Sequence, residues 1–215
     1  MINFSFKKFI KKGGWSGFQK GMTYVELIVV LSIFATMTSI VMFNYGDFQQ
    51  KIYIRNLTSE IALKIVEAQK DAMSGKKPPQ YTPPGWRPAY GVSFGSYAYL
   101  GASEGTMDMV YYADLDKNND FSDGYCRLPP VNSAECMDML TLTNGNRISN
   151  LEVFPNGLGT SVSVENLSIT FERPYSRAVF ASSYGGDPAF VEITIVSPNG
   201  ISGKIRVHAT GRIEI

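Results

Sequence analysis

The chain has 215 residues, of which 44% are hydrophobic and 13% aromatic, enough for one well-buried domain with an appendage and too many for wholesale disorder. Its formal net charge is +1, but residues 1–21 hold five lysines and no acid, so the rest of the chain carries −4. This balance gives no strong signal for nucleic-acid binding, although a local basic patch is compatible with it.

A lysine-rich leader opens the chain and precedes a long apolar run. From Leu27 to Gly46 twenty consecutive residues are uncharged, and a helix of that length covers the roughly 30 Å hydrocarbon core of a membrane. All five lysines of the leader lie before this run. The positive-inside rule therefore predicts a single-pass protein of the inner (cytoplasmic) membrane, with its N-terminus in the cytoplasm and its bulk outside.

The junction between leader and apolar run reads Lys20-Gly-Met-Thr-Tyr-Val-Glu26, so a charged segment ends in glycine and one carboxylate opens the apolar helix. This junction resembles the type IV prepilin family, which includes the pseudopilins of type II secretion. In that family a membrane peptidase cuts after the glycine and methylates the new N-terminus, and the fifth residue of the product is Glu. The resemblance implies cleavage after Gly21 and N-methylation of Met22, which stands where Phe is usual.

Glu26 also has a physical reason to be there. An ionised carboxylate near an apolar helix end costs several kcal/mol unless it finds a partner. The amine freed at Met22 is such a partner, in the same chain or in a staggered neighbour, where the pairing would set subunit register. The alternative is that Glu26 extends to the lipid headgroups.

The helix is predicted to run from Met22 to Ser74, transmembrane to about residue 46 and amphipathic beyond it. Past the span, apolar residues recur at three- and four-residue steps with charged residues between them. These apolar positions are Ile54, Leu57, Ile61, Ile65, Ala68 and Ala72. Gly75 is the expected C-cap. No proline interrupts the helix, whereas many pilins carry one in its membrane half, and this difference favours a pseudopilin.

Residues 75–88 contain five prolines and are predicted to form a connector, with a proline-rich ligand for a partner's aromatic groove as the alternative. The runs that follow are β-branched and aromatic, separated by Gly, Pro, Asn and Asp. They predict strands at 90–100, 107–112, 166–171, 178–181, 190–196, 201–208 and 212–215, with a hairpin turn at 197–200. The expected fold class is α+β, pilin-like, with the long helix packed on an antiparallel β-sheet or small β-sandwich within 89–215.

An acidic segment at 114–124 places oxygen-bearing side chains at alternate positions, as a loop around one hard cation requires. Its start resembles an EF-hand-type calcium loop, with Asp114, Asp116 and Asn118 at the first, third and fifth places. The predicted calcium ligands are Asp114, Asp116, Asn118, Asp120 and Asp123. A solvated Asp/Asn-rich turn is the alternative.

The acidic segment departs from that family at two places. Asn119 stands where the family has Gly, a change that is tolerable because Asn adopts the left-handed conformation. Tyr125 stands where the family has a bidentate Glu, and Asp123 is the candidate replacement. Phe121 supplies the apolar eighth place. A site with so few charged ligands would have modest affinity, sufficient outside the cell.

The two cysteines, Cys126 and Cys136, form no motif that could complete a structural zinc site. In an oxidising compartment a disulfide between them would contribute about 2–3 kcal/mol, and two unrelated buried thiols are the alternative. His208 is the only histidine and lies in a predicted strand. No nucleophile with a nearby base follows from the sequence, so an enzyme is not expected.

The predicted function is therefore that of a structural subunit, a pilin or minor pseudopilin of a type IV pilus-like or type II secretion-like filament. Its expected partners are other such subunits through the N-terminal helix, the prepilin peptidase and methyltransferase, and the membrane. The alternative is a membrane-anchored, extracytoplasmic, calcium-dependent binding or adhesion module.

Overall fold

The computed structural model describes most of the chain, and the described residues are 21–79, 85–95, 108–121, 135–157 and 160–215. The chain divides into two compact units, Met1–Tyr45 and Gly46–Ile215. Of the predicted leader, only Gly21 falls within the described residues.

One helix, α1 (Tyr24–Ser74), forms the described part of the first unit and continues into the second. Thr23 caps its N-terminus, because Thr23 Oγ1 accepts a hydrogen bond from the backbone N–H of Glu26 at 3.3 Å. At the other end Gly75 has a φ of 63°, and its N–H donates to the carbonyl of Ala72 at 3.1 Å. The N–H of Lys76 donates to the carbonyl of Asp71 at 3.1 Å, which completes a Schellman motif. The predicted helix and its C-cap are confirmed.

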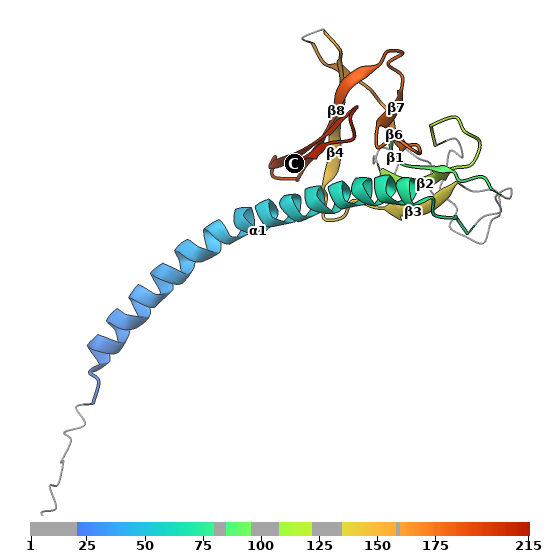
Figure 1. Cartoon of the computed structure of the whole chain (residues 1–215). Helices are drawn as coiled ribbons and strands as arrows, with labels where there is room; N and C mark the ends of the chain where they lie inside the picture. The colour runs from blue at the N-terminus through green and yellow to red at the C-terminus, as the bar shows by residue number, and fades with distance from the viewer. Residues whose placement is uncertain (1–20, 80–84, 96–107, 122–134, 158–159) are drawn as a thin grey trace, which may run out of the picture. The chain divides into compact units, whose positions relative to one another are not determined.

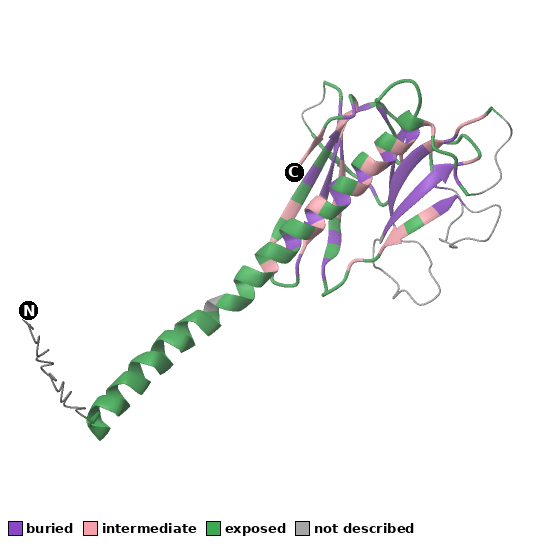
Figure 2. Ribbon diagram, turned by 60° about the horizontal axis from the view of Figure 1, so that its bottom comes forward, coloured by how far each residue is buried: buried purple, intermediate pink, exposed green. Residues whose placement is uncertain are grey.

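The two parts of α1 differ in burial. Among the described residues α1 is the one helix long and apolar enough to cross a membrane, judged by length and composition. Every described side chain from Gly21 to Phe43 is exposed, whereas beyond residue 50 one face of the helix is buried (Figure 2). The buried positions include five of the six predicted from spacing, namely Ile54, Ile61, Ile65, Ala68 and Ala72, and Leu57 is partly buried. The predicted amphipathic face is confirmed.

Beyond α1, the described residues of the second unit form two antiparallel five-stranded sheets (Figure 1). The first sheet has the order β3 (Cys136–Leu140), β2 (Asp108–Asp114), β1 (Ala89–Gly95), β6 (Leu167–Phe171), β7 (Ala178–Ser182). The second sheet has the order β10 (Ile213–Glu214), β9 (Ser202–His208), β8 (Pro188–Val196), β4 (Arg147–Pro155), β5 (Val162–Ser163). The α+β class with an antiparallel β-rich domain is confirmed.

The larger of the two core clusters among the described residues joins the buried face of α1 to the inner faces of both sheets. Polar contacts hold the helix in place around this core. Tyr111 Oη of β2 donates to Asp71 Oδ2 of α1 at 2.6 Å, and Lys64 Nζ contacts Asp138 Oδ2 of β3 at 2.9 Å. The contact with Asp138 raises the pKa of Lys64. Because residues alternate between the two faces of a strand, the first sheet also has an outer face, opposite the helix.

Of the ten strands in the described part of the chain, seven overlap the predicted runs and three were not predicted. The missed strands are β3, β4 and β5. The pairing of β4 with β8 shifts register between Ile148 and Asn150, so the two-residue alternation that marks a strand is interrupted there. The predicted hairpin turn between β8 and β9 is confirmed, since Gly200 N donates to Ser197 O at 2.9 Å.

Candidate functional site

The acidic segment leaves the end of β2 and turns back over the first sheet. Asp114 is the last residue of β2, and the chain then bends through Lys117 and Asn119, which have φ values of 68° and 61°. The left-handed conformation expected of Asn119 is confirmed. Two such residues within three positions make the tight turn that a loop around a cation requires.

Asp114 organises this turn. Its Oδ1 accepts hydrogen bonds from the backbone N–H groups of Lys117 at 2.7 Å and Asn118 at 3.2 Å, and its Oδ2 accepts one from Asn119 N at 3.2 Å. The side chain is buried. Burial raises the pKa of the Asp114 carboxyl, the N–H donors lower it, and the neighbouring Asp116 raises it, so that the pKa lies above its ordinary value.

Three carboxylates converge at this turn: Asp114, Asp116 and Glu135 each place an oxygen within 4.8 Å of the others. Glu135 is buried, lies directly before β3, and accepts a hydrogen bond from Leu115 N at 3.0 Å. Carboxylate oxygens are hard ligands of the kind that calcium and magnesium prefer. The cluster can therefore bind a metal ion.

Glu135 is the ligand candidate that the sequence analysis missed. It joins the cluster because β3 pairs with β2, and the N–H of Ala113 donates to the Glu135 carbonyl at 2.9 Å. Only recognition of β3 as the partner of β2 could have indicated it. Such recognition is difficult, because Cys136-Met-Asp-Met-Leu140 contains no β-branched residue.

The other predicted ligands lie elsewhere or cannot be placed. Asn118 Nδ2 donates to Asp116 Oδ2 at 2.8 Å, so Asn118 supports the cluster from its exposed side. Asp120 is turned toward the first sheet, where its Oδ1 accepts from Ser168 Oγ at 2.5 Å, and it is not one of the three converging carboxylates. Asp123 lies outside the described residues.

A buried polar and aromatic layer fastens the loop to the outer face of the first sheet. Phe121 packs on Tyr112 with ring centroids 5.7 Å apart. The Tyr112 hydroxyl contacts Thr170 Oγ1 at 2.7 Å, and Thr170 Oγ1 donates to the Asn119 carbonyl at 2.9 Å. The Tyr112 ring crosses β1 at Gly91, where a Cβ would lie 2.9 Å from the ring. Glycine is therefore required for this packing, which holds the second half of the loop in place.

The predicted disulfide involves one residue that the structure places. Cys136 is buried at the start of β3, on the same outer face as Tyr112 and Phe121. Cys126 lies outside the described residues, so the pairing stays a prediction.

The predicted processing residues lie at the exposed start of α1. Gly21 and Met22 precede the helix, and Glu26 lies in its first turn. The spacing Thr23-x-x-Glu26 is that of a capping box, and the structure contains the Thr23 half of it. Glu26 is the only charged residue between Gly21 and Gly46.

The only histidine has structural contacts. His208 Nε2 lies 3.3 Å from Glu214 Oε2, and the His208 ring packs at 5.4 Å on Phe190. The contact with Glu214 joins β9 to β10, and the contact with Phe190 joins β9 to β8. They agree with the interpretation of His208 as a strand residue with local partners.

Comparison with protein-family models, with curated proteins and with solved structures gives no match for this chain. The family assignment therefore stays a prediction that depends on Gly21, Met22 and Glu26.

Proposed function

We propose that this chain is a membrane-anchored structural subunit, a pilin or minor pseudopilin, that assembles into an extracytoplasmic filament through the first half of α1. The observation that supports this most is the exposure of every described side chain from Gly21 to Phe43, in a stretch with one charged residue. Such a surface requires lipid or other helices around it. The expected partners are other copies or related subunits, and the prepilin peptidase.

Glu26 is the residue on which this proposal makes its sharpest claim. In apolar surroundings its carboxylate would neutralise the amine of Met22 in an incoming subunit. Its place in a capping box offers a purely local role instead, namely capping the start of α1. Either Glu or Gln can fill that position of a capping box. Glu26→Gln therefore removes the charge while keeping the capping function, which separates the two roles.

The first experiment expresses Glu26→Gln in cells that make the filament, with Glu60→Gln as the matched control on the exposed face of the same helix. We expect the first variant to enter the membrane and be cleaved normally but to yield few filaments by electron microscopy, and the control to assemble normally. Mass spectrometry of assembled chains should show that the mature N-terminus is methylated Met22. Filaments at wild-type levels from Glu26→Gln, or an intact Met1, would contradict the proposal.

We further propose that the carboxylate cluster holds calcium and thereby orders the loop after β2. Support comes from the three hard oxygen ligands of Asp114, Asp116 and Glu135, which converge within 4.8 Å of one another. Burial, and to a smaller extent Asp116, raises the pKa of Asp114, and a bound cation would offset both the burial of the charge and the repulsion. In addition, Asn119 Oδ1 is buried and has no hydrogen-bond partner among the described residues.

Calcium titration of the full chain in detergent micelles tests this site. At about ten times the dissociation constant a cation that binds only the folded state stabilises it by about 1.4 kcal/mol, measurable as a higher melting temperature. We expect Glu135→Gln to abolish the shift and Asp120→Asn to retain it, because Asp120 points toward Ser168 instead. The reverse result would favour the ligands predicted from sequence, and no shift with the wild type would favour a solvated turn.

The cation site also supports a second candidate function, a membrane-anchored calcium-dependent binding module. Electron microscopy of surface filaments from cells with and without this chain distinguishes the two. A subunit required for assembly would change filament number or length, whereas a binding module would leave both unchanged.

A further inference from the structure

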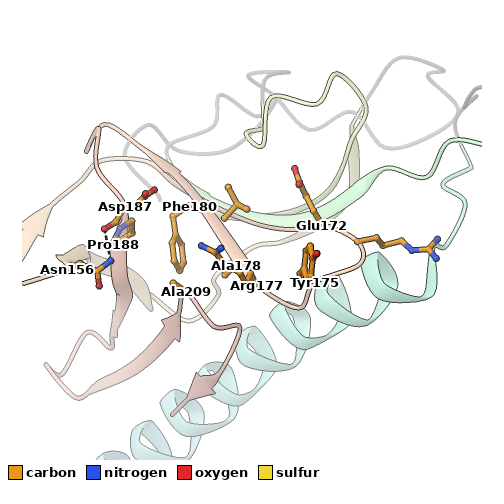
Figure 3. A pocket seen from close by; sticks show the side chains of 11 residues that line it. Asn156, Glu172, Tyr175, Arg177, Ala178, Phe180, Asp187, Pro188 and Ala209 are labelled. Carbon is orange, nitrogen blue, oxygen red and sulfur yellow. Dashed lines mark hydrogen bonds between the residues drawn. The ribbon is translucent and has the colours of Figure 1, made fainter.

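The outer edge of β7 lies open along a groove. β7 is the last strand of the first sheet, so one of its sides faces no other strand of that sheet. Two adjoining pockets, of about 400 and 580 Å³, follow this side, and Phe180 and Asp187 line both. Figure 3 shows the first pocket, with Phe180 between Asp187 and Arg177. The groove therefore extends along the length of the strand.

The backbone register shows which groups face the groove. In an antiparallel pair, the backbone N–H and C=O groups of alternate residues either bond to the partner strand or point away from it. The backbone N–H of Ala178 points away from β6, because it donates to the carbonyl of Ala209 at 3.1 Å. Phe180 and Ser182 follow at two-residue steps and have the same orientation. Within the described part of the chain, no hydrogen bond engages the N–H of either residue.

The two ends of the groove differ in charge. Arg173 and Arg177 line the end near the start of β7, together with Glu172, and neither arginine forms an ion pair with a described residue. The end beyond Ser182 is lined by Glu165, Asp120 and Asp187, and by no Lys or Arg among the described residues. The middle is lined by the apolar ring of Phe180 together with Asp187, because these two residues line both pockets. The groove is thus weakly basic at one end and acidic at the other.

We propose that this edge binds an extended peptide segment of a partner protein, which adds a sixth strand antiparallel to β7. All strand pairs in both sheets are antiparallel, which favours this direction. The N-terminal end of the added segment then lies beside Glu165. Its C-terminal end points toward Arg177 and stops at Ala209, which already accepts the Ala178 N–H. Charge complementarity selects a segment with a basic residue near its N-terminus, an apolar middle and an acidic residue near its C-terminus.

This inference does not depend on the filament proposal, because it concerns only residues of the second unit. The N–H and C=O groups of Phe180 and Ser182 would supply binding energy through main-chain hydrogen bonds, and the charged ends would supply direction. A merely solvated edge would bind peptides of either charge order equally weakly or not at all.

The test uses the full chain in detergent micelles and two capped seven-residue peptides of alternating Thr and Val. One peptide has Lys at its N-terminal end and Glu at its C-terminal end, and the other has the two charges exchanged. We expect the first to bind about fivefold more tightly and to slow hydrogen exchange at the amides of Phe180 and Ser182. A third peptide, N-methylated at the groups that would face β7, should not bind.

A charge-swapped protein makes the test reciprocal. Glu165→Lys combined with Arg177→Glu changes two exposed side chains and should leave the melting temperature unchanged. This variant should prefer the exchanged peptide by about the same factor. The proposal is overturned if the swap leaves the preference unchanged, if no peptide protects Phe180 and Ser182 at millimolar concentration, or if the N-methylated peptide binds equally well.

Discussion

Both halves of α1 contain large apolar side chains, but the structure buries them only in the second half. Ile33 in the first unit is 50% exposed, whereas Ile65 in the second unit is fully buried. Between Leu27 and Gly46 no charged residue interrupts the apolar sequence, so the helix is apolar all round. Beyond that point charged residues alternate with the apolar ones and leave a single apolar face.

This difference shows that the apolar content of a segment does not by itself predict that the segment is buried in a protein core. A helix that is apolar on every side requires an apolar environment, and the described residues do not cover the first half of α1. A helix with one apolar face is instead covered by the sheets of its own chain, as in the second half. The first half of α1 therefore depends on lipid or other helices around it, and the second half depends on the two sheets that pack against it.

The largest expected effect comes from truncating the same residue type in both halves. We expect Ile65→Ala to lower the free energy of unfolding by about 3 kcal/mol, because it leaves a cavity between α1 and the sheets. Ile33→Ala should change it by less than about 0.5 kcal/mol. Both changes replace Ile by Ala in a helix, so the change in helix propensity is the same for both and cancels when the two variants are compared. Urea unfolding of the full chain in micelles, followed by tyrosine circular dichroism, measures both.

Equal effects from the two substitutions would contradict the comparison. They would mean that the first half of α1 folds together with the second unit as one cooperative core. A loss at Ile65 alone, with an unchanged slope of free energy against urea, would show that the second unit unfolds by itself.

How much of the fold the sequence predicts depends on how regular each element is. The helix and strands β6, β8 and β9 follow clean three-to-four- or two-residue periods and are predicted nearly to their ends. β4 is the partner of β8 and central to the second sheet, yet its register shift at Ile148 and its terminal Pro155 disguise it. β5 has only two residues, too few to show a period.

The candidate cation site shows the same limit. Asp114 and Asp116 are close in sequence, so a local motif predicts them, and the left-handed Asn119 follows from the intrinsic preference of Asn. Glu135 comes from a distant segment and depends on the pairing of β2 with β3. Asp120 fits the local pattern but turns to Ser168 because that hydroxyl lies on the neighbouring sheet surface. Tertiary contacts decide both outcomes.

A smaller loss of stability is expected from removing the buried charge of Glu192, in the second unit. Glu192 of β8 is 2% exposed, and its carboxylate contacts Lys204 Nζ and Arg206 Nε, each at 2.6 Å. Burial raises the pKa of Glu192, but the hydrogen bonds from Lys204 and Arg206 outweigh it and hold the pKa below 4.5. We expect Glu192→Gln to cost about 1–2 kcal/mol at neutral pH.

The pH dependence of this effect has a definite sign. A carboxyl whose pKa is lowered by folding contributes stability above its unfolded pKa, and that contribution disappears as the pH falls through the folded value. The difference between wild type and Glu192→Gln should therefore shrink below about pH 4.5 in urea unfolding. Glu152→Gln, directly opposite on β4, is the control and should have little effect or stabilise slightly. A constant difference across pH would show that packing, not charge, is responsible.

The smallest expected effect concerns the start of α1. Thr23 Oγ1 accepts the hydrogen bond from Glu26 N, so Thr23→Ala removes a cap worth about 1 kcal/mol. Because the first unit lies outside the core that unfolds with the sheets, this loss should stay local. We expect about fivefold faster hydrogen exchange at the amides of the first helical turn in micelles and an unchanged melting temperature. Thr38→Ala is the control, since Thr38 Oγ1 donates to the carbonyl of Phe34 in mid-helix and caps nothing. A melting temperature lowered by Thr23→Ala would show instead that stability passes from one half of α1 to the other.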